Sequence, residues 1–82
     1  MQQIARTEKQ LGAQLRRFRK TASLSQAQIG LRTGKRQATL SNLEGGAGGT
    51  LETLFAVLNA LDLEMVVRPR SKGGATNLED IF

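Results

Sequence analysis

Hydrophobic residues recur with helical spacing along most of this chain. A first helix is predicted after Thr7, which stands three residues before Gln10 as in a capping box. Its expected buried stripe comprises Leu11, Leu15, Phe18 and Ala22. The largest apolar stripe of the chain follows Thr50 and comprises Leu51, Leu54, Phe55, Leu58 and Leu61. We expect these two helices to supply most of the core.

Two shorter helices are predicted between them, at residues 26–33 and 36–44. Ser25 and Gln28 have capping-box spacing, so the serine oxygen and the glutamine side chain can satisfy free amides at a helix start. Gly34 follows the last turn, where glycine takes the left-handed conformation without a Cβ penalty. The pattern therefore predicts a helix, a tight turn and a second helix.

The second of these helices has one apolar and one polar face. Leu40 and Leu43 are expected to pack on Ile29 and Leu31, with Gly30 allowing the two helices to approach closely. The outward face is small and polar, and is formed by Gln37, Ala38, Ser41 and Asn42. Amides, a hydroxyl and a methyl group match base edges in the major groove of DNA. This arrangement is typical of a helix-turn-helix motif.

The spacing changes from helical to alternating after Asp62. Leu63, Met65 and Val67 alternate with other residues until Pro69 ends the run, which predicts one β-strand. No second run of this kind occurs, so the strand needs a partner outside its own chain. We expect antiparallel pairing with the same segment of a second subunit, and hence a homodimer.

The overall prediction is a mainly all-α protein with four to five helices and one C-terminal strand. Residues 1–69 are expected to form the DNA-binding and dimerisation domain, and residues 70–82 a flexible tail. A chain of 82 residues buries only a small core, which also favours self-association.

Composition argues against an enzyme. The chain has no cysteine and no histidine, which excludes disulfides, the usual zinc sites and nucleophile-histidine catalysis. We therefore expect no catalytic residue, no metal site and no cofactor. No apolar run is long enough for a membrane span and no signal-peptide core is present, so we expect a cytoplasmic protein without a membrane partner.

The net charge of +5 is unevenly distributed along the chain. Residues 6–36 contain nine basic residues and one acid, whereas residues 37–82 contain three basic residues and six acids. Such a basic half is either an ordinary solvated surface or a phosphate-binding surface. The adjacent helix-turn-helix pattern favours phosphate binding.

Arg19 is the exception among these basic residues. A packed first helix would bring it beside Glu44 at the end of the reading helix, so we expect the two to form a structural clamp. The glycine-rich run at residues 45–49 lacks the features of a nucleotide-binding loop. It is either a flexible connection or a set of bare amides that bonds one DNA phosphate.

The tail ends in a cluster with two acids and three apolar residues, Leu78, Ile81 and Phe82. Two interpretations are open. The cluster is either a frayed terminus or a short segment that docks into a partner and becomes ordered on binding.

The residues described above resemble the Cro/cI-type, or xenobiotic-response-element, helix-turn-helix family. The resemblance covers residues 10–68 and rests on Ser25, Gly34 and the runs KRQATLSNLE at 35–44 and TLETL at 50–54. Within that family, the recognition helix and the segment LDLEM at 61–65 are most similar to the HipB-type antitoxins of toxin-antitoxin operons.

This resemblance implies a dimeric repressor that binds a palindromic operator in double-stranded DNA. It implies that bases are read by Arg36, Gln37, Ala38 and Ser41. It implies that the phosphate backbone is held by Gln26, Lys35, Thr39 and Asn42. A HipA-like kinase toxin, held inactive, is the further partner that it implies. The alternatives are a stand-alone repressor without a toxin and a non-DNA interaction module, which would bind all DNA weakly and without sequence preference.

Overall fold

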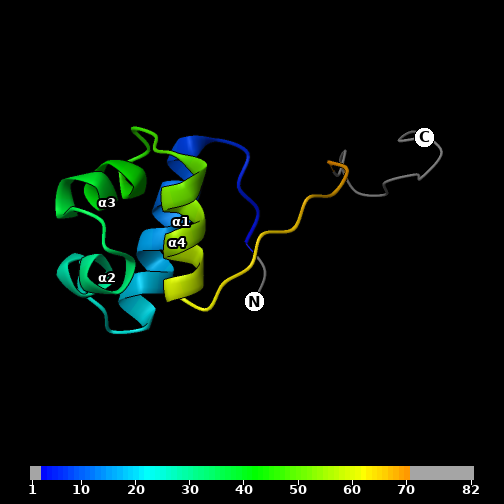
Figure 1. The fold of residues 1–82 in the computed structure, drawn as a ribbon. Coiled ribbons are helices and arrows are strands. Elements are labelled where there is room, and N and C mark those ends of the chain that lie inside the picture. The colour runs from blue at the N-terminus through cyan, green and yellow to red at the C-terminus, as the bar shows by residue number, and fades with distance from the viewer. Residues whose placement is uncertain (1–2, 71–82) are drawn as a thin grey trace.

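A computed structural model describes residues 3–70 and contains four helices in that range. The helices are α1 (Glu8–Thr21), α2 (Gln26–Thr33), α3 (Gln37–Glu44) and α4 (Leu51–Ala60). α2 and α3 lie on one side of the molecule, at the left in Figure 1, and α1 and α4 lie beside them. The all-α helix-turn-helix prediction is confirmed, with four helices and no strand in the described residues.

The segment that follows α4 runs extended, away from the α2 and α3 side (Figure 1). It contains Leu63, Met65 and Val67 of the expected dimer strand. No strand pairs with this segment among the described residues, so strand pairing across a dimer stays a prediction. The cluster formed by Leu78, Ile81 and Phe82 lies outside the described residues.

The predicted helix starts are present, with one variation. Ser25 and Gln28 form the complete capping box of α2, and Thr50 accepts a bond from the Thr53 amide at the start of α4. Thr7 accepts a bond from the Gln10 amide, but the Gln10 side chain accepts from the amide of residue 6 and not from that of Thr7. The cap of α1 therefore also fixes the arm that precedes it.

The helix ends include two left-handed residues that the sequence did not indicate. Gly34 has φ of 70°, as predicted, but Ser23 and Asp62 also have φ near 60° (60° and 58°). The amides that follow them turn back to the helices, Leu24 N to Arg19 O and Leu63 N to Leu58 O. These bonds end α1 and α4 in the manner of a Schellman motif without glycine.

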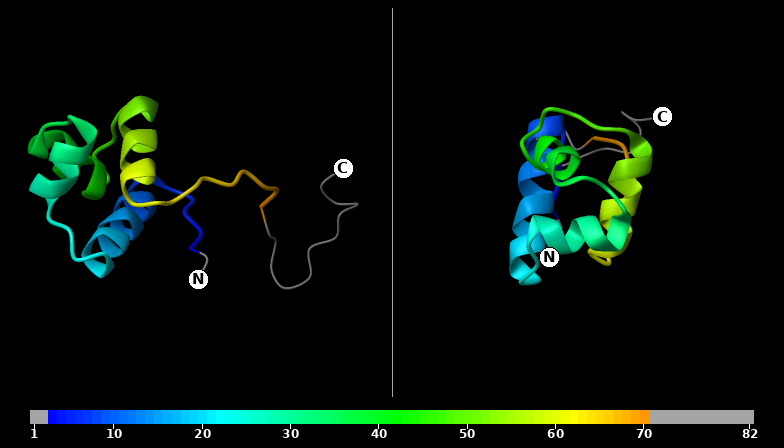
Figure 2. Two further views of the ribbon diagram at one scale, coloured as in Figure 1. Left: turned by 60° about the horizontal axis from the view of Figure 1, so that its bottom comes forward. Right: turned by 60° about the vertical axis from the view of Figure 1, so that its left-hand side comes forward.

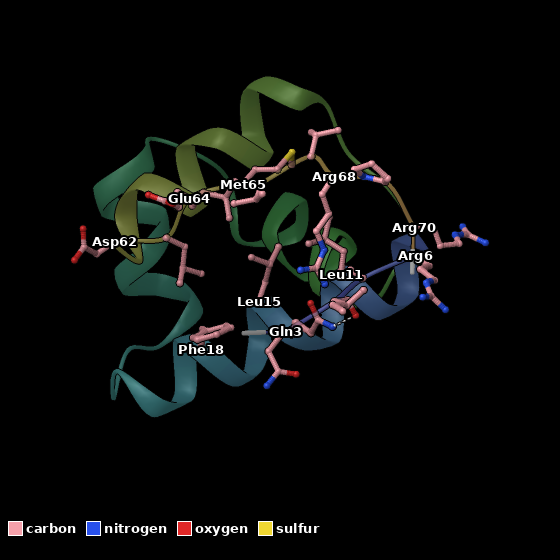
Figure 3. Close-up of a pocket in the computed structure, with 18 residues that line it drawn as sticks. Gln3, Arg6, Leu11, Leu15, Phe18, Asp62, Glu64, Met65, Arg68 and Arg70 are labelled. Carbon is pink, nitrogen blue, oxygen red and sulfur yellow. Dashed lines mark hydrogen bonds between the residues drawn. The ribbon is translucent and has the colours of Figure 1, made fainter. Parts of the chain in front are cut away.

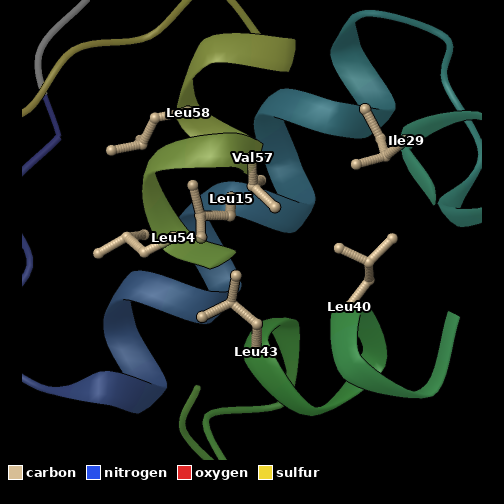
Figure 4. Close-up of a cluster of buried hydrophobic side chains, with 7 residues drawn as sticks. All are labelled: Leu15, Ile29, Leu40, Leu43, Leu54, Val57 and Leu58. Carbon is tan, nitrogen blue, oxygen red and sulfur yellow. The ribbon is translucent and has the colours of Figure 1, made fainter. Parts of the chain in front are cut away.

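Seven buried side chains form the core, and they come from all four helices (Figure 4). They are Leu15, Ile29, Leu40, Leu43, Leu54, Val57 and Leu58. α3 packs on both α1 and α2, while α4 closes the core against α2.

Four residues expected in the core are instead exposed. Leu31 is 86% exposed, because two residues after Ile29 a helix has turned by about 200° and points away from the core. Leu51 and Phe55 are 70% and 47% exposed, since the apolar arc of α4 is wider than the surface that α1 and α2 cover. Ala22 is exposed because it lies past the last turn of α1, at its C-cap.

Two glycines allow close backbone contacts. A Cβ on Gly30 would lie 2.9 Å from the carbonyl oxygen of Lys35, so the close contact at Gly30 is with the turn between α2 and α3 and not with α3 itself. A Cβ on Gly12 would lie 2.3 Å from the carbonyl oxygen of Leu43 and 2.5 Å from that of Glu44. Only a glycine allows α1 to contact the end of α3 so closely.

Candidate DNA-binding surface

The outward face of α3 is exposed, as a reading surface must be. Figure 2 presents this side in its right-hand view, where α2 and α3 stand in front of the other helices. The exposed residues on α3 and its N-cap are Arg36, Gln37, Ala38, Ser41 and Asn42. Arg36 is the N-cap by its backbone, and its side chain makes no capping bond. Its guanidinium group is therefore not used to cap α3.

The inner end of α3 is held by Arg19 of α1. The Arg19 Nε atom donates to Glu44 Oε2 at 2.6 Å, and a second guanidinium nitrogen donates to Glu44 Oε1 at 3.0 Å. Only 10% of the Arg19 side chain and 9% of the Glu44 side chain are exposed. A third bond runs from Arg19 to the carbonyl oxygen of Leu24, in the connection to α2. One guanidinium group thus joins three parts of the chain.

A hydrogen-bonded path leads from this pair to the reading face. Gln26, the first residue of α2, donates from Nε2 to Glu44 Oε1 at 3.0 Å. Gln37, the first residue of α3, donates from Nε2 to Gln26 Oε1 at 3.4 Å. The buried carboxylate therefore orients two amides in sequence, and the second is the one expected to read a base.

The pair shifts the acid–base properties of both members. Burial of Glu44 acts to raise its pKa, but hydrogen bonds from Arg19 and Gln26 and the charges of Arg19 and Arg16 outweigh it, so the pKa of Glu44 is lowered. The hydrogen bond to Glu44 raises the pKa of Arg19 against the opposing effect of burial. Glu44 is therefore ionised at neutral pH.

The residues expected to hold phosphates differ in their surroundings. Gln26 and Thr39 are half-buried, whereas Asn42 is exposed. Lys35 forms an ion pair with Glu52 of α4 at 2.5 Å, and 24% of its side chain is exposed. The hydrogen bond that Lys35 donates to Glu52 is the main cause of the lowered pKa of Glu52. Lys35 would have to leave Glu52 in order to reach a phosphate.

Comparison with known proteins agrees with this geometry. The family model of the helix-turn-helix domain matches residues 10–70. This chain belongs to the helix-turn-helix domain family. Its resemblance to HipB-type regulators is confirmed, and it is a DNA-binding regulator by that membership.

Solved structures similar to this helix-turn-helix protein include three complexes of HipB. A HipB variant bound to an O2 20mer has a TM-score of 0.81 and 29% identity, covering 87% of this chain and 100% of that one. The complex of HipA, HipB, O2 and O3 has a TM-score of 0.76, with the same identity and coverage. A complex of HipB with O1 and O2 has a TM-score of 0.74 and 30% identity, covering 84% and 100%. No curated protein matched the sequence.

The opposite side of this helix-turn-helix domain has a groove of about 960 Å³. Its floor is α1, with Leu11, Leu15 and Phe18, and its walls are the N-terminal arm and residues 62–70 (Figure 3). Large apolar side chains next to it are exposed, including Val67 at 91%. Residues 3–70 therefore leave the second face of the domain open.

Several features of the site had only weak signals in the sequence. The pairing of Arg19 with Glu44 was predicted, but the close backbone contact of α1 with α3 at Gly12 was not. Nothing in the spacing indicated the bond from Gln26 to Glu44 or the ion pair between Lys35 and Glu52. Among the described residues, no cluster of ligating side chains could hold a metal ion, and no helix is long and apolar enough to cross a membrane.

Proposed function

We propose that this protein is a dimeric, sequence-specific transcriptional repressor of the HipB type, which represses its own operon and binds a HipA-like kinase toxin. The observation that carries the proposal is the exposed polar face of α3, held from behind by the buried pair of Arg19 and Glu44. Similarity to HipB structures with operator DNA supports the same function.

The side chains on this face suit different bases. The Gln37 amide can pair with the N6 and N7 edge of adenine, and the Ala38 methyl can contact a thymine methyl. The Arg36 guanidinium suits a guanine and the Ser41 hydroxyl accepts or donates. Backbone contacts fall to Gln26, Lys35, Thr39 and Asn42, which flank the reading face.

A dimer would place two such helices in successive major grooves of a palindromic operator, about one helical turn apart or a multiple of it. The segment Leu63 to Val67 supports this proposal, because it is extended and exposes apolar side chains next to the groove. Antiparallel pairing of two such segments would satisfy the strand and bury those side chains. Repression then acts by excluding polymerase from the DNA.

Binding of a HipA-like kinase would involve the remaining surface of the dimer, and the cluster of Leu78, Ile81 and Phe82 is our proposed docking segment. Similarity to a HipB chain in a complex with HipA supports this part. Residues 1–69 are proposed as the domain and residues 70–82 as its tail. No enzymatic step and no cofactor are needed for repression or for inhibition of a bound kinase.

Substitution of Gln37 by alanine tests the reading face. We expect affinity for the operator to fall by about 1 to 3 kcal/mol per half-site, and preference to relax at one base position. Asn59→Ala removes an exposed amide from α4 and should change neither property. If Gln37→Ala binds operator and scrambled DNA as the parent does, Gln37 reads no base.

Co-purification from the native host tests the toxin partner. The full chain should retain a kinase that a chain ending at residue 70 does not retain, while both bind operator DNA. If no kinase accompanies the full chain, the protein is a stand-alone repressor. If the shorter chain still retains the kinase, the docking segment lies within residues 1–70.

A further inference from the structure

The structure sorts the basic half of the chain into residues with different surroundings. Arg19 is buried in its pair with Glu44, and Lys35 is paired with Glu52. Arg6 lies beside the groove on the far side of the domain (Figure 3). The other basic residues of the first helix remain on its surface, namely Lys9, Arg16, Arg17 and Lys20.

Three of these residues share one narrow face of α1. At 100° per residue, Lys9, Arg16 and Lys20 fall within an arc of about 40°, and Ala13 lies at its edge. All four are exposed. We refer to Lys9, Ala13, Arg16 and Lys20 as the α1 stripe. Arg17 lies about 60° further round the helix, beyond Lys20.

The α1 stripe borders the recognition side of the domain. Gly12, next to the stripe, contacts the carbonyl oxygens of Leu43 and Glu44 at the end of α3. Arg16 is near enough to help lower the pKa of Glu44. Viewed from the recognition side, α1 forms one border of the face made by α2 and α3 (Figure 2). The stripe is therefore the exposed part of α1 that lies next to its contact with α3, whereas Leu11 and Phe18 are on the part of α1 that faces the groove.

No residue of the α1 stripe forms an ion pair within residues 3–70, although the charge of Arg16 acts on Glu44 at longer range. Among residues 3–70, the ion pairs are those of Arg19 with Glu44 and of Lys35 with Glu52, and neither includes a stripe residue. The small side chain of Ala13 leaves the helix surface open between the charges. Three exposed cations in a row, none of them in an ion pair among the described residues, suit a row of phosphates.

We propose that the α1 stripe is a second phosphate-binding site, which contacts the DNA backbone beside the bases read by α3. The inference rests on the proposed function, because it requires the α3 face to lie against DNA. It assigns Lys9, Arg16 and Lys20 to phosphates and assigns no base to them. The stripe adds affinity and salt dependence without adding sequence preference.

A charge-matched pair of triple variants tests the proposal. K9Q/R16Q/K20Q removes the α1 stripe charges, and R17Q/R32Q/K72Q removes three basic charges elsewhere in the chain. Affinity for operator and for scrambled DNA is measured as a function of salt. The slope of log K against log salt is negative, and each lost phosphate contact makes it less steep by about 0.9. The stripe variant should therefore have a slope that is less steep by about 2.7 per subunit. The control variant should keep the slope of the parent.

Equal effects of the two triple variants would mean that net charge alone matters, and would overturn the proposal. An unchanged slope in the stripe variant would overturn it as well. If the triple variant does not fold by circular dichroism, Arg16→Gln and Lys20→Gln are measured singly, each with an expected loss of about 0.9. Gln37→Ala tests the reading of a base through sequence preference, whereas the stripe variant tests phosphate contacts through salt dependence. Either proposal can therefore be overturned without the other.

Discussion

The two faces of this domain differ in how completely one chain builds them. On the recognition side, Arg19 bonds to two elements at once, and Gly12 and Gly30 allow backbone contacts that no other residue would permit. On the opposite side, a groove of about 960 Å³ is open and Val67 is 91% exposed. Residues 3–70 thus complete the packing of the recognition side, whereas they leave the groove side open.

The two faces therefore differ in which interactions make them rigid. The reading face is fixed by polar bonds in a buried site and by close backbone packing, both of which are independent of protein concentration. Residues 3–70 leave apolar side chains exposed on the groove face. A second chain would bury them in the proposed dimer, so the order of this face would depend on protein concentration. Substitutions on the two sides should therefore have different consequences.

The largest effect is expected from Arg19→Ala. It leaves Glu44 buried without its partner, and removing one member of such a pair costs about 3 to 5 kcal/mol of unfolding free energy. Urea denaturation measures the loss. Arg17→Ala, an exposed residue of the same helix, should change the unfolding free energy by less than about 0.5 kcal/mol. Similar losses in both variants would show that the recognition side is not held by this pair.

A smaller effect is expected from Gly12→Ala. The added methyl group would meet the carbonyl oxygens of Leu43 and Glu44, so α1 must move away from α3. Overpacking of this kind costs about 1 to 3 kcal/mol. Ala13→Gly removes a methyl group one residue later and serves as a comparison, with a loss of about 1 kcal/mol from helix propensity alone. A Gly12→Ala variant more stable than the parent would contradict the close contact.

Acid should weaken the recognition side next, and by less. Because the pKa of Glu44 is lowered in the folded protein, its contribution is complete above the pKa of an unfolded glutamate, about 4.3. The unfolded state binds more protons below that range, so stability falls as pH falls through the folded pKa. Denaturation at pH 7 and pH 3 measures this loss. Glu44→Gln should lose less stability than the parent between these two pH values.

The smallest effect on folding is expected from Val67→Lys on the groove side. The Val67 side chain is 91% exposed, so in dilute protein the unfolding free energy should change by less than about 0.5 kcal/mol. The oligomeric state should change instead, because the proposed strand pair would carry a charge. Analytical ultracentrifugation at increasing concentration measures it. A parent that stays monomeric at all concentrations would contradict the proposed dimer.

The elements of the fold were largely predictable from local patterns. The capping box of Ser25 and Gln28 and the left-handed Gly34 act over a few residues, so their spacing was enough to place α2 and the turn. Predictions of burial were less successful, because burial depends on what a neighbouring helix covers. Leu31 and Phe55 have the spacing of core residues, yet no element lies over them.

The candidate site was predictable in its residues and less so in its connections. The polar face of α3 follows from the sequence, since the helix is short and its two leucines leave one side free. The ion pair of Lys35 with Glu52 joins residues 17 positions apart and depends on how α4 packs. Left-handed backbone at Ser23 and Asp62 had no signal, because neither residue is one that the conformation requires.

The path from Glu44 to Gln37 also has a direction. An ionised carboxylate can only accept, so Gln26 must give its amide nitrogen to Glu44 and turn its oxygen outward. Gln37 then donates one N–H to that oxygen, and its second N–H and its own side-chain oxygen stay available for the proposed contact with DNA. The major-groove edge of adenine has an acceptor, N7, beside a donor, the N6 amino group, so it can pair with this donor and acceptor of Gln37. Glu44→Gln would allow the amides to point either way. If Gln37 reads a base as proposed, the charge of Glu44 therefore selects that base through two hydrogen bonds, without contacting the DNA.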